Sequence, residues 1–188
     1  MSIFDRIAAA VTPTASEEKR AEARAEIETH AAREPWLRMI VDQHKQIERL
    51  FSEARNAADP EMASRCVEDL AALLTGHATA EEAVLYPELA EYDGKTHAGM
   101  GYEEHAMTKV QLARLRDLQP STQEWREKLE HVESAVQQHV YQEEHTWLPE
   151  LVAKLPDERK SLLAARYREE FGRYCGAETI DAKFETSL

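Results

Sequence analysis

Apolar residues recur at intervals of three and four positions along most of this chain, which is the spacing of one face of an α-helix. Residues 17–33 are strongly charged, and their apolar face is mostly alanine, which predicts an accessory helix on the surface. Each of five further stretches has a stripe of larger apolar residues. We therefore expect helices over residues 36–56, 60–87, 102–118, 121–149 and 157–174.

Prolines and glycines stand between these stretches. Pro35 and Pro60 mark the starts of two predicted helices, and Pro87 and Pro149 are expected to end two others. Residues 93–101 hold three of the six glycines and are expected to form the clearest loop. Six glycines and seven prolines in 188 residues are too few for the many turns of a β-sandwich or barrel.

The pattern thus predicts an all-α fold, an antiparallel up-down four-helix bundle with an extra helix at each end. Residues 1–35 are expected to form an N-terminal extension with the accessory helix. Residues 36–150 would form the bundle, and residues 151–188 a C-terminal helix and tail. A chain of this length is able to bury a sizeable core.

The chain carries 36 acidic and 23 basic side chains, a formal net charge of −13. This charge argues against a nucleic-acid partner, whose phosphates attract lysine and arginine, and against docking on an anionic membrane. No apolar run is long enough to span a membrane, and the apolar stretch near the N-terminus is too short for the core of a signal peptide. Cys66 and Cys175 form no paired motif, so neither a disulfide framework nor a thiolate zinc site is expected. We expect a cytoplasmic protein.

The eight histidines contain the strongest internal repeat of the chain. Residues 77–87 and 139–149 share a histidine, two glutamates four and five positions later, and a proline at the tenth. A single histidine, His44 or His105, precedes the two elements by 33 and 34 residues respectively. The order of one lone histidine followed by HxxxE therefore occurs twice.

The HxxxE spacing places each histidine and its glutamate on one helix face. The same stripes otherwise hold valine and leucine, so His77 with Glu81 and His139 with Glu143 are expected to point into the core. A buried carboxylate without a partner is very costly. Four histidines and two glutamates in one bundle interior therefore indicate bound metal, and two ions would explain two carboxylates placed to bridge.

The donor types alone leave the metal open. Imidazole suits zinc, copper, iron or nickel, and mixed nitrogen and oxygen sites with open positions favour iron chemistry. No histidine has a glutamate three positions before it, which excludes the ExxH motif of ferritin-like di-iron proteins. HExxH is also absent, which excludes a zincin.

The doubled order, with both elements followed by an aromatic residue or leucine and then proline, resembles the hemerythrin-like (HHE cation-binding) family over about residues 36–150. The resemblance implies an antiparallel four-helix bundle that holds an oxo- or hydroxo-bridged, non-heme di-iron centre. Zinc or manganese in place of iron stays open, because these ligands discriminate weakly. Carried over residue by residue, the implied ligands are His44 and His77 for one iron, His105 and His139 for the other, and Glu81 and Glu143 for the bridge.

The sequence departs from the oxygen-carrying hemerythrins, which place two histidines four residues apart on the third bundle helix. The neighbours of His105 at that spacing are Gly101 and Lys109, so the second iron lacks one ligand unless another residue supplies it. The set of four histidines and two carboxylates resembles bacterial members linked to nitric-oxide or peroxide chemistry and iron–sulfur repair.

The resemblance therefore implies binding and redox conversion of oxygen, nitric oxide or peroxide, by an oxidoreductase of peroxidase or nitric-oxide-reductase type. Such a reaction calls for an electron donor or partner protein. The alternative is a non-catalytic oxygen or nitric-oxide sensor, carrier or iron store.

Other residues near the motifs are expected to have supporting parts. His97 is expected in the glycine-rich loop, with a fifth metal ligand as the alternative, and His145 is expected on the surface. Glu82 and Glu144 lie one step round the helix and are expected to orient ligands or face solvent. Most nearby aromatic residues are expected to pack, although a tyrosine at the open iron position could act as ligand, hydrogen-bond donor or redox relay; the candidates are Tyr86, Tyr102 and Tyr141.

Overall fold

The computed structural model of the chain describes residues 15–92 and 95–175, and these residues are helical with short connections. The two ends of the chain, parts of the predicted extension and tail, lie outside the described residues. The elements in chain order are α2 (Glu17–Ala31), α3 (Pro35–Arg55), α4 (Pro60–Ala80), η1 (Glu81–Leu85), α5 (Tyr86–Tyr92), α6 (Lys95–Asp117), α7 (Gln123–Gln142), η2 (Glu143–Trp147), α8 (Leu148–Lys154) and α9 (Asp157–Cys175).

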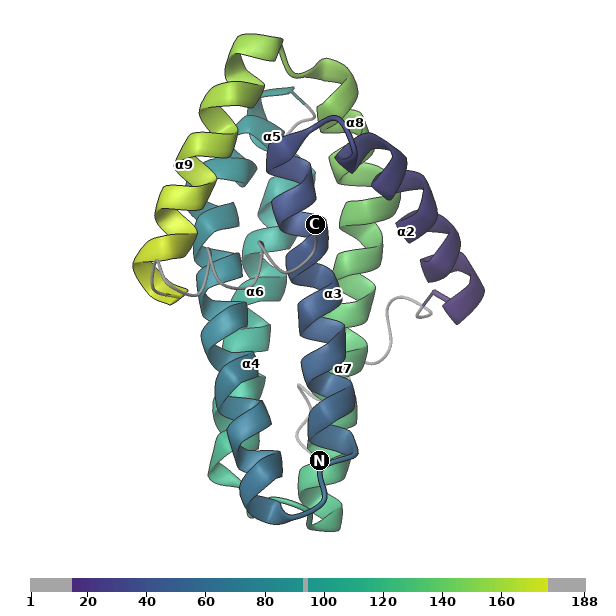
Figure 1. Cartoon of the computed structure of the whole chain (residues 1–188), viewed down its shortest axis with the longest axis vertical. Helices are drawn as coiled ribbons and strands as arrows, with labels where there is room; N and C mark the ends of the chain where they lie inside the picture. Colours follow the sequence, from purple (N-terminus) through teal and green to yellow (C-terminus); the bar gives the residue numbers. More distant parts are fainter. Residues whose placement is uncertain (1–14, 93–94, 176–188) are drawn as a thin grey trace.

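The long helices α3, α4, α6 and α7 lie side by side along the long axis of the molecule (Figure 1). Within this set of four, each helix packs on two of the others: α3 packs on α4 and α7, and α6 packs on the same two helices. Their apolar stripes meet in the middle, where Ile40, Leu70, Leu115 and Leu129 are at most 2% exposed. Each such side chain stabilises the fold by about 1.5–3 kcal/mol. The predicted four-helix bundle is confirmed.

An extra helix flanks the bundle at each end of the described chain, as predicted. The C-terminal α9 packs on α3 and α4 through Leu163, Tyr167 and Phe171, all of which are buried. The N-terminal α2 lies on α3 and η2 and buries Ile27 completely. None of the helices in the described part of the chain is long and apolar enough to cross a membrane.

The prediction that Pro87 and Pro149 end their helices is wrong. In each case a π-helical turn precedes the proline, and the backbone N–H of the residue just before it bonds five positions back, Tyr86 to Glu81 and Leu148 to Glu143. A proline inside an α-helix lacks one N–H and its ring clashes with the preceding turn. A wider turn just before the proline relieves this conflict, and the helical path continues into α5 and α8.

The predicted loop over residues 93–101 is also wrong for most of its length, because α6 already begins at Lys95. Residues 93 and 94 lie outside the described residues. Gly101 lies inside the helix, and a Cβ atom there would stand only 2.6 Å from Cζ of Tyr86. Glycine costs a helix about 1 kcal/mol relative to alanine. This glycine therefore serves close packing of an aromatic ring and not a turn.

Candidate metal centre

The structure brings all six residues of the doubled motif together in the bundle interior. The four histidines come from the four long helices, and the two glutamates begin the π-turns η1 and η2. All six are buried, with at most 6% exposed. Their possible metal-binding atoms form two groups, and within each group these atoms lie within 4.8 Å of one another. The first group is His44, His77, Glu81 and Glu143, and the second group is Glu81, His105 and His139.

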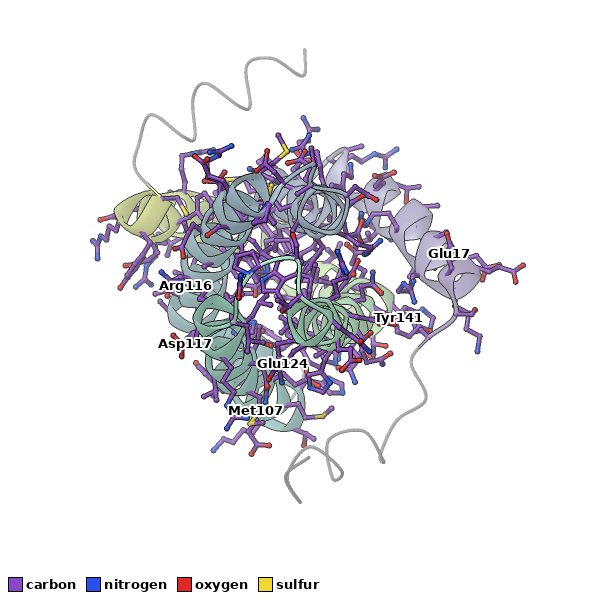
Figure 2. All side chains as sticks on the ribbon, turned by 90° about the horizontal axis from the view of Figure 1, so that it is seen from below. Glu17, Met107, Arg116, Asp117, Glu124 and Tyr141 are labelled. Atoms are coloured by element: carbon purple, nitrogen blue, oxygen red, sulfur yellow. The ribbon has the colours of Figure 1, made fainter. Side chains whose placement is uncertain are left out.

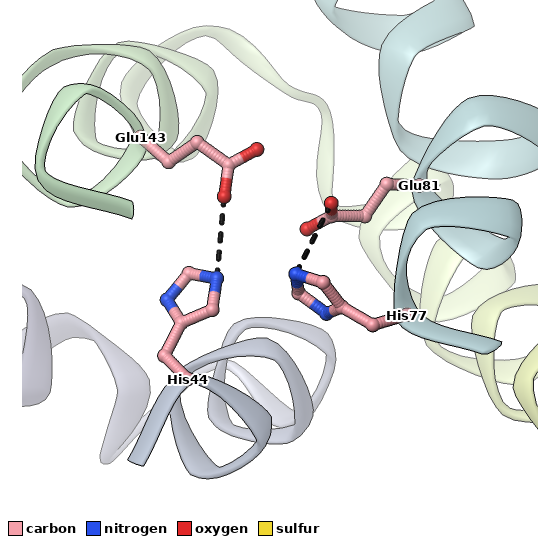
Figure 3. Close-up of side chains that lie close together, drawn as sticks. All are labelled: His44, His77, Glu81 and Glu143. Carbon is pink, nitrogen blue, oxygen red and sulfur yellow. Dashed lines mark ion pairs between the residues drawn. The ribbon is translucent and has the colours of Figure 1, made fainter. Parts of the chain in front are cut away.

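Both glutamates reach from one histidine pair to the other. Oε2 of Glu81 lies 3.3 Å from Nε2 of His77 and 3.4 Å from Nε2 of His105. Glu143 instead uses both oxygens, with Oε2 at 3.2 Å from Nε2 of His44 and Oε1 at 3.5 Å from Nε2 of His139. Figure 3 shows the first half of this arrangement, with Glu143 facing His44 and Glu81 facing His77. This geometry suits two bridging carboxylates.

Several of these inward-facing atoms have no hydrogen-bond partner although they are buried. They are Nε2 of His44 and His77, both oxygens of Glu81 and Oε2 of Glu143. Buried polar atoms are almost always hydrogen-bonded, and a buried charge needs a compensating charge. Imidazole nitrogens and carboxylate oxygens are the donors that transition-metal ions take. The unpartnered atoms therefore fit a bound cation.

In each of the four histidines of the motif, the nitrogen that points away from the centre, Nδ1, contacts a side-chain oxygen. Nδ1 lies 2.8 Å from Glu144 in His44, 2.9 Å from Gln43 in His77, 3.1 Å from Glu82 in His105 and 2.7 Å from Glu104 in His139. A carboxylate or amide oxygen only accepts, so each Nδ1 carries the hydrogen. Each Nε2 then faces the centre, which is the arrangement of ligating histidines in metalloproteins.

These orienting residues follow the internal repeat. The residue after each glutamate of the HxxxE motif, Glu82 or Glu144, holds a lone histidine of another helix. The residue before each lone histidine, Gln43 or Glu104, holds an HxxxE histidine. Of the two expectations for Glu82 and Glu144, to orient ligands or to face solvent, the contacts favour the first, whereas Gln43 and Glu104 were not predicted. Their position next to the lone histidines was the available signal.

In the described part of the chain, hydrogen bonds from the two terminal helices support the first group. From α2, Arg24 donates to both oxygens of Glu144 at 2.7 Å, and from α9, the Tyr167 hydroxyl donates to Gln43 at 2.8 Å. Both residues support the histidine pair His44 and His77 from outside. The sequence contains no pattern that singles out Arg24 or Tyr167, because these contacts span more than a hundred residues.

Burial and neighbouring charges shift the pKa values of the histidines and glutamates in the site. Burial alone lowers the pKa of His44, but the adjacent carboxylates of Glu143 and Glu144 outweigh it and raise the pKa to about 10. Burial and the adjacent His44 lower the pKa of His77. Burial and the charge of Glu143 raise the pKa of Glu81. With no ion bound, a proton on His44 supplies part of the positive charge that the two carboxylates require, and a bound cation would take the place of that proton.

Tyr86 fills the space beside the second group that Gly101 leaves open. Its hydroxyl donates to Oε1 of Glu143 at 3.1 Å and lies 3.1 Å from Nε2 of His105. Burial and the charges of Glu143 and Glu81 raise the pKa of Tyr86 well above its usual value, so the phenol keeps its proton. The side chain that the sequence lacks four positions before His105 is thus replaced in space by a phenol.

The other histidines lie outside both groups. His97 belongs to α6 and not to a loop; it is half-buried, and its ring stacks on Trp147 at a centroid distance of 5.6 Å. His145 is exposed, as expected, and stacks on Tyr141.

Comparison with known proteins gives one family and two relatives. The family model described as the hemerythrin HHE cation binding domain matches residues 37–151. A DNA nickase of Nostoc sp. (strain PCC 7120 / SAG 25.82 / UTEX 2576) is 28% identical over 125 residues, which are 66% of this chain and 36% of that protein. An uncharacterized hemerythrin-like protein of Schizosaccharomyces pombe is 24% identical over 131 residues, which are 68% of this chain and 64% of that protein. The chain thus spans less than two thirds of either relative, and no solved structure matches.

Proposed function

The chain belongs to the hemerythrin HHE cation-binding family, and on this premise we propose that its bundle holds two non-heme iron ions. The supporting observation is that each glutamate contacts a histidine of both pairs. Zinc or manganese could occupy the same donors, and metal analysis decides between them. In this proposal the ligands are His44 and His77 for one ion, His105 and His139 for the other, and Glu81 and Glu143 for the bridge.

We further propose that the site binds and redox-converts a small ligand, namely oxygen, nitric oxide or peroxide. Iron would supply electrons and an open coordination position. The observation that supports this is the small number of donors, since two histidines and two bridging carboxylates would give each ion four protein donors, and Gly101 offers none beside His105. The second ion then has room for a ligand. The reaction class would be an oxidoreductase of peroxidase or nitric-oxide-reductase type, supplied by an electron donor.

Tyr86 would serve this reaction as a hydrogen-bond donor. Its hydroxyl already lies beside His105 and keeps its proton because its pKa is raised. A donor in a buried site interacts strongly with charge that develops on a neighbouring ligand. The phenol would orient the ligand by donating a hydrogen bond to it from Oη.

DNA nicking is not part of this proposal. The matched segment is 36% of the Nostoc protein, and the net charge of −13 works against contacts with phosphate. We propose a cytoplasmic protein whose partners are a small ligand and an electron donor.

The test combines metal content with reactivity. We expect about two irons per chain, near-ultraviolet absorption of an oxo-bridged diferric site in the aerobic protein, and turnover when the diferrous protein is mixed with peroxide or nitric oxide. A stable, reversible adduct without product would instead support the non-catalytic sensor, carrier or store. Less than one iron per chain would contradict the di-iron proposal.

The outer residues should control metal affinity. Because the carboxylate of Glu104 fixes Nδ1 of His139 at 2.7 Å, Glu104→Ala should lower the affinity for the second ion by about 10–100-fold. Glu103→Ala is the matched control, since Glu103 is the preceding residue on α6 and is exposed. Competition with a calibrated chelator measures both variants. Equal affinities would show that this contact does not support the site.

A further inference from the structure

A cavity of about 110 Å³ opens between α4 and α6 and ends at the candidate metal centre. Three histidines, His77, His105 and His139, stand at its inner end. Its outer members, among them Thr75 and Ala113, are exposed and form a rim. The walls between are mostly aliphatic, formed by Ile47, Ala71, Leu74, Leu112, Val136 and Val140.

The cavity is much larger than a diatomic molecule requires. An engineered cavity of about 150 Å³ with apolar walls binds benzene or xenon. A volume of about 110 Å³ therefore fits a molecule of several heavy atoms. Buried aliphatic walls offer no partners for a charge, so an ion would lose its hydration without compensation.

The rim does not select anions either. Lys109 pairs with Glu82 at 2.8 Å, and Arg116 pairs with Glu68 at 2.6 Å, so both cations have a nearby carboxylate. The whole chain carries a net charge of −13, which repels anions at low ionic strength. Rim and walls together favour an uncharged ligand.

The cavity reaches the two histidine pairs unequally. It touches both histidines of the second group, His105 and His139, but only His77 of the first group, and His44 and Glu143 are not among its lining. Glu143 also lies farther from the second group, at 3.5 Å from His139, than from His44 in the first group, at 3.2 Å. The cavity thus ends where a ligand has room to bind.

We propose that this cavity admits and holds the ligand of the site, an uncharged and largely apolar molecule of up to several heavy atoms. The ligand enters between α4 and α6 past Thr108 and meets the second group at His105 and His139. The part that concerns the metal rests on the proposed function, whereas the class of ligand rests on the cavity itself.

The first experiment uses xenon, which needs no metal. In the purified chain, xenon should bind saturably and shift the NMR signals of Leu74, Leu112 and Val136. Ala71→Leu fills the cavity and should weaken xenon binding by about fivefold or more. Ala72→Leu is the matched control, because the neighbouring Ala72 is exposed and outside the cavity lining. If xenon shifts no cavity residue, or if Ala71→Leu binds it as well as Ala72→Leu, the proposal is overturned.

The second experiment tests the route in the iron-loaded chain. Thr108→Trp narrows the rim and should slow nitric-oxide binding by about tenfold with unchanged iron content. Met107→Trp is the control, since Met107 is 48% exposed and lies at the periphery of the bundle (Figure 2). Equal rates in both variants would overturn this route and leave the metal function intact. If the chain purified without chelator holds less than one iron and still binds xenon, the iron content contradicts the metal function and the xenon binding supports the ligand class.

Discussion

Replacing Glu81 by leucine should empty both metal positions at once, whereas replacing His139 by alanine should empty only one. Glu81 is the single residue that belongs to both groups of candidate ligands, and Oε2 lies between His77 and His105. Its loss removes a donor and a negative charge from each ion. We expect the Glu81→Leu chain to hold almost no metal and His139→Ala to keep about one ion of two.

Elemental analysis of both variants, purified without chelator, measures this difference. Glu124→Leu controls for the change of charge and side chain, because Glu124 is exposed and lies in the first turn of α7, far along the chain from the candidate ligands of that helix. It should keep the full metal content. If Glu81→Leu retains one ion, Glu81 does not bridge and the two groups bind independently.

Local spacing explains why the sequence predicts the inner site well. Four residues along a helix return to the same face, so His77 and Glu81 must project together whatever the rest of the fold does. The apolar neighbours on that face then direct the pair inward. The lone histidines His44 and His105 lie on other helices, and the doubled order was needed to connect them with the pairs. The structure brings all of these residues together.

The errors arose where tertiary packing overrides a local rule. Proline and glycine usually interrupt helices, yet Pro87 follows a π-turn and Gly101 makes room for Tyr86 inside α6. Both exceptions lie beside the candidate metal centre, where irregular helical turns often occur in proteins. A rule that treats each residue with its sequence neighbours alone has no access to the ring of Tyr86, fifteen positions away.

The contacts that support the site from the terminal helices could not be predicted from the sequence for a different reason. Arg24 and Tyr167 come from helices outside the bundle and contact Glu144 and Gln43 across long chain separations. An arginine on a charged helix and a tyrosine on an apolar stripe are ordinary features. Only the packing of α2 on η2 and of α9 on α3 gives them their partners. Both act on the His44 and His77 pair, which makes the two halves of the site unequal.

Metal removal should destabilise the parent chain strongly. It should also make the parent chain less stable than the Glu81→Leu variant, whereas with metal bound the parent is the more stable of the two. A ligand at about 1,000 times its Kd stabilises a protein by about 4 kcal/mol, so chelation should lower the Tm by roughly 8–16 °C in a chain of this size. In the metal-free parent, both oxygens of Glu81 are buried without hydrogen bonds. Such an unsatisfied group costs about 1–3 kcal/mol. Glu81→Leu removes that cost together with the metal.

Calorimetry of both proteins, with metal and after chelation, measures which of the two is more stable in each state. With metal the parent is the more stable protein, and after chelation the Glu81→Leu chain is more stable by about 1–3 kcal/mol. Chelation should leave the Tm of Glu81→Leu unchanged, because that chain has no ion to lose. Glu124→Leu should lose as much stability on chelation as the parent does. If the parent stays the more stable protein after chelation, Glu81 has another partner in the metal-free bundle, and its buried charge does not depend on a cation.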